Sequence, residues 1–174
     1  MSREYFLKTT RIGFSKWSSE DFALAESLWG NPEVTKYICA TGVFSQEDIL
    51  ARLEKEIANN NAYGVQYWPI FELATGNLIG CCGLRPYNET MYEIGFHLRP
   101  EFWGQGYAVE AANAAIDYAF HVLHAEGLFA GHNPKNLASG KVLAKLHFQY
   151  VRDEFYAPTG LYHPSYELKR TYHS

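Results

Sequence analysis

The hydrophobic period of the chain changes at Gly64, and this change limits the possible folds more than any other feature. Before Gly64, apolar residues recur at helical spacing in two segments, which begin near Phe22 and near Ile49 after helix-start signatures. After Gly64, three successive segments read as strands, and the turn-rich connector 74–77 predicts a hairpin between the first two. These three strand-like segments span residues 65–73, 78–84 and 91–98.

A long helical pattern at 107–123 follows the third of these strands. Its alanines recur on one face, which favours close packing on a sheet. The other expected elements are strands at 7–14, 128–131, 148–156 and 162–168 and a helix at 137–146. No repeat or linker interrupts the order, so we expect residues 1–174 to form a single α/β domain.

Charge and cysteine usage exclude several classes of protein. Lys and Arg number 15 against 19 Asp and Glu, a net charge of -4, which disfavours a nucleic-acid-binding protein. The three cysteines show neither a disulfide framework nor metal-ligand spacing, so no metal is expected. No signal-like or membrane-length apolar run occurs, and we expect a cytoplasmic protein without membrane contact.

The segment from Arg99 to Ala108 joins the third strand to the long helix. It contains the residues that most strongly indicate a ligand-binding function. Gly104 and Gly106 let the backbone come close to a ligand at a helix N-terminus, where free amides and the helix dipole favour an anion. A pyrophosphate fits such a cradle, although glycines at such a place also serve tight turns. Neither a Walker A loop nor a dinucleotide fingerprint is present.

The chain resembles the GNAT superfamily of acyl-CoA N-acyltransferases, and within it the ribosomal-protein N-terminal acetyltransferases. Several separated motifs, which occur in one order from Thr10 to Tyr166, carry the resemblance. They are residues 19–21, 31–34, 76–80, 92–96, 102–108 with 110–111, 136–139, and 142–146 with Phe148.

The resemblance implies a mostly antiparallel central sheet, flanked by helices and splayed between strands 91–98 and 128–131, with acetyl-CoA in the gap. The main chain of the first strand would pair with pantetheine, loop amides would hold the pyrophosphate, and residues at the next helix start would contact the pantetheine arm or cap the helix. The cofactor-binding residues so implied are Phe96, His97, Leu98, Gly104, Gln105, Gly106, Tyr107, Ala108, Asn136 and Ser139.

Three positions depart from the family pattern. Glu101 stands where Gln or Arg usually opens the loop, which removes side-chain help to the phosphates but leaves the amides. His147 replaces the usual glycine before Phe148, so the turn there needs a strained or different backbone. Leu143 stands where many members have a tyrosine acid.

Acetyl transfer to an amine needs a group that takes up a proton, and Glu93 in the third strand is the preferred base. Matching glutamates in similar proteins have that role, and the competing interpretation is an ion pair with a neighbour such as Arg85. His97, two residues further on the same strand face, is either a proton relay or a histidine that flanks the cofactor. Cys81 and Cys82 are expected as buried small side chains and not as acyl-accepting thiols.

The sequence therefore predicts an N-acetyltransferase that moves an acetyl group from acetyl-CoA to a primary amine by direct attack. The acceptor is a small amine or the amino terminus of a protein. The alternative is a catalytically silent acyl-CoA-binding regulator, motivated by Leu143. Both a monomer and a homodimer stay open, since the terminal strand 162–168, with Tyr172 beyond it, offers a surface for a dimer.

Overall fold

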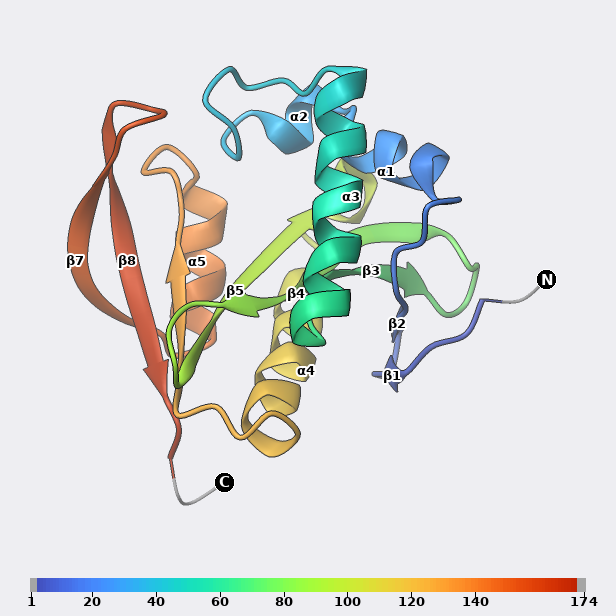
Figure 1. Cartoon of the computed structure of the whole chain (residues 1–174). Coiled ribbons are helices and arrows are strands. Elements are labelled where there is room, and N and C mark those ends of the chain that lie inside the picture. Colours follow the sequence, from blue (N-terminus) through green and yellow to red (C-terminus); the bar gives the residue numbers. More distant parts are fainter. Residues whose placement is uncertain (1–2, 172–174) are drawn as a thin grey trace.

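The computed structural model describes residues 3–171, which fold around one eight-stranded sheet with the order β1-β2-β3-β4-β5-β6-β8-β7 (Figure 1). All neighbouring strands are antiparallel except β5 and β6, which run parallel. The predicted mixed α/β fold with a mostly antiparallel sheet is confirmed. The strands are β1 (Leu7–Lys8), β2 (Ile12–Phe14), β3 (Tyr67–Glu72), β4 (Leu78–Pro86), β5 (Met91–Leu98), β6 (Gly127–Gly131), β7 (Gln149–Tyr156) and β8 (Leu161–Lys169).

Helices cover both faces of the sheet, and each face has its own hydrophobic cluster. In Figure 1, α3 crosses in front of the sheet and α4 lies behind it. The front cluster joins α1 and α3 to the sheet around Trp29, whereas the rear cluster joins α4 to it around Ile94. The helices are α1 (Phe22–Trp29), α2 (Pro32–Thr35), α3 (Gln46–Tyr63), α4 (Tyr107–His121) and α5 (Leu137–Lys145), with a 3-10 turn at Pro100–Phe102.

Local sequence explains where the long helices begin and why they pack as they do. Ser45 and Asp48 form a reciprocal capping box at the start of α3, and Gly64 ends that helix with a φ of 73°. The alanine face of α4 is buried on the sheet at Ala111, Ala112, Ala115 and Ala119, as its spacing predicts. Small side chains there let the helix axis come close to β4 and β5.

Two details of the sequence prediction were wrong. The expected strand at 7–14 is a hairpin of β1 and β2, because the chain turns between them with Thr9 N donating to Ile12 O at 2.8 Å. Asn31 and Pro32 start the short helix α2 and do not simply end α1, since the Asn31 side chain caps Glu33 N. Strand β8 is interior, so β7 forms that sheet edge, and Tyr172 lies outside the described residues.

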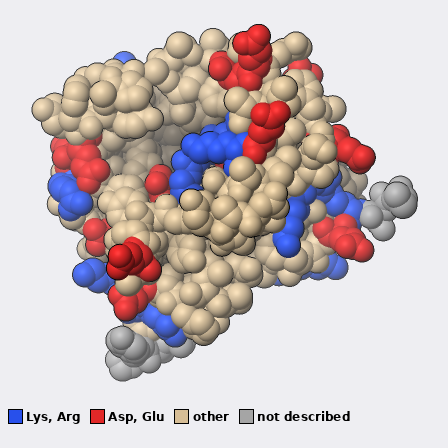
Figure 2. All heavy atoms as spheres, viewed as in Figure 1, with Lys and Arg blue, Asp and Glu red and all other residues tan. Residues whose placement is uncertain are grey.

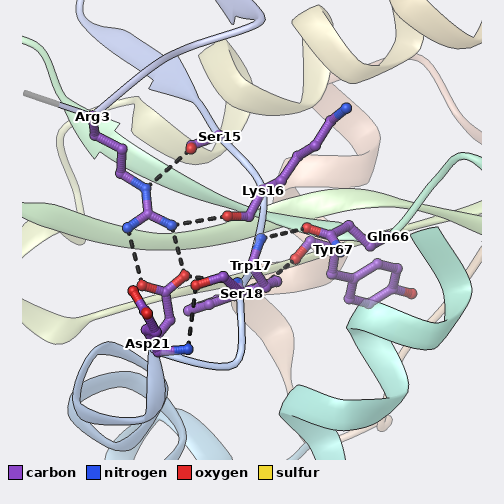
Figure 3. A network of polar contacts seen from close by, with 9 residues as sticks. Arg3, Ser15, Lys16, Trp17, Ser18, Asp21, Gln66 and Tyr67 are labelled. Atoms are coloured by element: carbon purple, nitrogen blue, oxygen red, sulfur yellow. Dashed lines mark hydrogen bonds and ion pairs between the residues drawn. The ribbon is translucent and has the colours of Figure 1, made fainter. Parts of the chain in front are cut away.

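A polar network fixes the segment before α1 against the sheet (Figure 3). Arg3 holds the Asp21 carboxylate at 2.8 and 3.1 Å, and Asp21 accepts from Ser18 N at 2.8 Å. Burial opposes ionisation of Asp21, but the bonds from Arg3 and Ser18 outweigh it and leave its pKa below the ordinary value. Next to it, Trp17 N donates to the buried Gln66 side chain at 2.8 Å, which ties this segment to the start of β3.

His147 has a positive φ of 67°, as the replacement of glycine at this position predicts. A side chain with a Cβ is strained there, and the His147 side chain is exposed. We expect His147→Gly to raise the free energy of unfolding by about 1 kcal/mol, because relief of strain exceeds the added freedom of the unfolded chain. Thermal or urea unfolding measures the change. His147→Ala keeps the Cβ and should not raise the free energy of unfolding. An equal rise in both variants would show that it comes from loss of the imidazole and not from loss of the Cβ.

Candidate active site

The sheet opens between β5 and β6 directly after Glu93. The two strands pair only from Met91 with Gly127 to Glu93 with Phe129. Beyond that point β5 stays on β4 as far as Leu98, whereas β6 stays on β8. The expected splay is therefore present, and one edge of β5 is open from residue 94 onward.

The parity of the ladder decides which main-chain groups of β5 reach this gap. Arg99 N donates to Ile79 O at 2.8 Å, so the antiparallel alternation turns the main chain of His97 toward β4. The main chain of the alternate residues Ile94, Phe96 and Leu98 therefore faces the gap. The indole Nε1 of Trp103 donates to the Leu98 carbonyl at 2.9 Å, which agrees with this direction. Main-chain pairing of His97 with a ligand in the gap, expected from the resemblance, is thus excluded by the register.

A groove of about 500 Å³ leads from this gap to the N-terminus of α4. Gly104 and Gly106 line it in left-handed conformations, with φ of 71° and 81°. Among residues 3–171, no acceptor stands in hydrogen-bonding geometry to the amides from Gly104 to Val109. A Cβ at Gly104 would meet no protein atom within 4 Å, so it would project into open space. Free amides at a helix start fit an anionic diphosphate.

Side chains from the first hairpin hold this glycine loop in place. Arg11 Nε pairs with Glu110 at 2.7 Å, and Arg11 Nη1 donates to the Gln105 carbonyl at 3.0 Å. The Thr9 hydroxyl donates to the same Glu110 carboxylate at 2.5 Å, and Tyr107 donates to Glu72. Sequence reasoning missed Arg11 and Thr9, because contacts across about a hundred residues leave no local pattern.

The remaining residues expected at the loop have different surroundings. The Gln105 side chain folds back onto the Glu101 carbonyl at 2.8 Å and does not line the groove. Glu101 itself pairs with Arg99 at 2.9 Å. Asn136 caps α5 by accepting from Ser139 N at 3.2 Å, so the capping role is present, and both residues also line the groove.

A second hollow, of about 370 Å³, continues from the groove and lies between α3 and the β7–β8 hairpin. Figure 2 shows it on the front face, with Lys and Arg side chains at its rim and an acidic side chain inside. Groove and hollow share one wall. The shared residues are Tyr37, Ile38, Phe96, His97, Asn136 and Ser139.

Glu93 lines the hollow at the point where β5 leaves β6. Burial raises the pKa of its carboxyl above the ordinary value, although Arg85, Lys55 and Arg52 oppose this. Arg85 lies directly opposite on β4, yet within the described chain the two side chains form no ion pair. The structure therefore does not support the ion-pair interpretation, and Glu93 is a partly desolvated carboxylate that faces a cavity.

His97 is a neutral imidazole that is already engaged. Trp29 Nε1 donates to its Nδ1 at 3.1 Å, which places the imidazole proton on Nε2. Burial, together with Arg52 and Arg85, holds the pKa of His97 well below its ordinary value. The imidazole therefore forms a fixed part of the lining of both cavities, and its Nδ1 is not free to relay a proton.

The thiols and Leu143 behave as apolar groups. Cys81 and Cys82 are buried, and burial raises the pKa of Cys81 to about 12. Such thiols are poor nucleophiles, so the interpretation of both as small core side chains agrees with the structure. Leu143 is buried and lines the hollow, where it offers no proton.

Neither a metal-type cluster of side chains nor a membrane-length apolar helix occurs within residues 3–171. No three His, Cys, Asp or Glu side chains come together as a metal site in the part of the chain that the structure describes. Within residues 3–171, none of the helices is both long and apolar enough to cross a membrane.

A helix start with free amides, an open strand edge and a carboxylate-bearing hollow lie in two adjoining cavities, an arrangement that suits a transferase with a large phosphorylated donor. Comparisons with known proteins agree. A family model described as an acetyltransferase (GNAT) domain matches residues 11–149. An uncharacterized N-acetyltransferase, p20, from Bacillus licheniformis is 32% identical over 148 residues, which cover 82% of each protein.

Solved structures show the same fold. A GNAT-family acetyltransferase from Bacillus anthracis superposes with a TM-score of 0.81 at 24% identity, over 94% of this chain and 97% of that one. RimL, a ribosomal L7/L12 alpha-N-protein acetyltransferase solved with coenzyme A, gives a TM-score of 0.80 at 16% identity, over 95% and 98% of the two chains.

The chain belongs to the GNAT acetyltransferase family. It is an acetyl-CoA-dependent N-acetyltransferase, as the sequence predicts.

Proposed function

We propose that the enzyme, as one catalytic domain, transfers the acetyl group to a primary amine by direct attack, with Glu93 as the base. One observation carries the proposal. The diphosphate-type groove and the Glu93-lined hollow meet along β5 at Phe96 and His97, just beyond the place where β5 separates from β6. A donor bound in the groove and an acceptor bound in the hollow would come into contact where the two cavities meet, next to Glu93.

The residues of the groove fit acetyl-CoA, which supplies an activated acetyl thioester when bound. Amides from Gly104 and Gly106 to Ala108 would hold its diphosphate, and the gap-facing main chain of Phe96 and Leu98 would pair with its pantetheine amides. Asn136 and Ser139 stand on the wall between donor and acceptor.

Glu93 would accept the proton that the amine loses. The nitrogen would form a bond to the acetyl carbon as the carbon–sulfur bond breaks, and the proton that Glu93 takes from the nitrogen would pass through solvent to the departing sulfur, which leaves as a thiol. A main-chain amide of Ile94 or Phe96, which faces the gap, would donate to the carbonyl oxygen as negative charge builds on it. Direct transfer needs no enzyme nucleophile, which suits a site whose thiols are buried and protonated.

The amino terminus of a protein is one acceptor of this class. Likeness to RimL, whose name gives the ribosomal protein L7/L12 as its substrate, supports it at the level of the fold. Release of thiol from acetyl-CoA, measured over a panel of small amines and peptides, tests the proposal. We expect release that depends on the amine. Binding of acetyl-CoA without amine-dependent release of thiol would contradict it and favour a silent regulator.

The pH dependence of the rate reports on Glu93. Because its pKa is raised and the base must be ionised, activity should fall as pH drops through that raised pKa. Arg85 lowers the pKa of Glu93, so Arg85→Gln should move the acid limb of kcat to higher pH. An acyl hydrazide as acceptor isolates this limb, because its nitrogen is neutral throughout. A limb that stays in place, or moves to lower pH, would separate Glu93 from the proton transfer.

A further inference from the structure

Arg85 presents an unpaired guanidinium inside the acceptor hollow. It stacks on the ring of Tyr67 at 4.3 Å, and within residues 3–171 it makes no hydrogen bond and no ion pair. Its Nε is shut off from solvent without a partner. A guanidinium that is largely withdrawn from water normally has an acceptor, so this one indicates a missing anionic group.

Arg52 brings a second guanidinium to the same ring. Its Nε is held by the fully buried Glu56 at 2.6 Å, and its charge lies 5.2 Å from the Tyr67 ring centre. Glu56 is itself fixed, because its other oxygen accepts from Tyr67 N at 2.8 Å. The Nη2 atom of Arg52 is buried without a partner. Two rigid cations therefore share one aromatic platform, each with an unused donor.

Positive charge exceeds negative charge around this platform. Lys55 lies near both guanidinium groups, and its pKa is lowered by burial and by the charges of Arg85 and Arg52. On the acidic side, Glu56 is committed to Arg52, and Glu154 at the hollow's outer wall is paired with Arg152 at 2.9 Å. Glu93 alone is left to face the cations, and it forms no ion pair with them. His97, the imidazole that lines the same wall, is neutral. An anion would satisfy this arrangement.

We propose that the acceptor is an amine that carries a carboxylate a few bonds from its nitrogen, bound by the terminal nitrogens of Arg85 with the charge of Arg52 beside them. The inference rests on the proposed function, since it assigns Glu93 to the amine. Arg85 and Glu93 are direct cross-strand partners, so their Cα atoms are about 5.5 Å apart. An ammonium facing Glu93 and a carboxylate facing Arg85 therefore belong to one compact zwitterion. A free amino acid and an acidic first residue of a peptide both have this chemistry.

Matched acceptor pairs test the proposal on the intact enzyme. Thiol release is measured with amino acids and their α-carboxamides, and with peptides that begin with Asp or Glu and their Asn or Gln counterparts. We expect kcat/KM to be at least about 10-fold higher for the carboxylate member of one pair, because a charge-assisted bond replaces an unpaired buried cation. The set of acceptors that shows the preference, amino acids or peptides, identifies which of the two carries the recognised carboxylate. Equal kcat/KM in both arms would overturn the inference and leave the proposed function standing.

Substitution of Arg85 locates the effect. Arg85→Gln should remove the preference for the carboxylate member, mainly through KM, when both members of a pair are compared in the same variant at a pH above the acid limb of kcat. The control Lys169→Gln removes one exposed positive charge at the far end of β8 and should keep the preference. A preference that survives Arg85→Gln would contradict the assignment.

Binding of the N-acetylated product gives a readout that needs no turnover. A thermal shift caused by N-acetyl amino acids, but not by their amides, and lost in Arg85→Gln, supports the anion site even if no amine is acetylated. In that case the proposed function fails and the inference about the site stands. Equal thermal shifts with the acids and with their amides would contradict the proposed anion site itself.

Discussion

Replacing Glu93 with Gln is expected to lower kcat about 100- to 10,000-fold, the range that general-base catalysis contributes. The carboxylate lines the acceptor hollow at the last position where β5 pairs with β6, and burial raises its pKa. The amide has nearly the same shape but takes up no proton. Affinity for acetyl-CoA should stay within about 2-fold, because the groove is built from other residues. Thiol release gives kcat, and calorimetry gives the affinity.

Glu89→Gln is the matched control for this variant. Glu89 is an exposed carboxylate in the loop that leads into β5, outside the residues that line either cavity. Its replacement should leave kcat unchanged. If Glu93→Gln keeps the wild-type rate, the proton is taken up by another group and Glu93 has no place in the mechanism.

Gly104→Val is expected to weaken acetyl-CoA binding about 100-fold or more, which corresponds to about 2.7 kcal/mol. The added side chain would project into the groove where a diphosphate must approach the amides of the α4 N-terminus. It would also strain a backbone whose φ is 71°. Titration calorimetry, or the thermal shift caused by acetyl-CoA, measures the loss.

Gly76→Val separates blocked binding from strain. Gly76 has a φ of 77° and, like Gly104, has no protein atom within 4 Å of an added Cβ, but it lies in the turn between β3 and β4. Both variants should lose similar stability, whereas only Gly104→Val should lose acetyl-CoA affinity. Equal affinities in the two variants would place the diphosphate elsewhere.

Local pattern alone predicted most of the secondary structure. The capping box at Ser45, the alanine face of α4 and the strand at 91–98 all form as expected, because each depends on residues within a few positions of one another. The glycine loop also lies where expected, since an N-terminal cradle needs only a strand, two glycines and a helix in sequence. The resemblance to one family added the splay of the sheet between the strands 91–98 and 128–131, and the structure places its start after Glu93.

Long-range pairing decided the rest. The register of β4 on β5 turns the main chain of His97 away from the gap, and no run of residues announces this result. The same register places Arg85 directly opposite Glu93, a neighbour that the sequence offered only as one interpretation. The support of the loop by Arg11 and Thr9, and the orphaned charges of Arg85 and Arg52, arise between segments that are distant in sequence.

The sequence by itself therefore determined the order of the elements, the helix ends, the glycine cradle and the candidate base, because propensity, capping and backbone freedom are local properties. Only the tertiary structure decided which side chains share a cavity, which of them find partners and which stay unpaired. Burial and electrostatic balance depend on every segment that packs around a charge, and that set exists only in the folded chain.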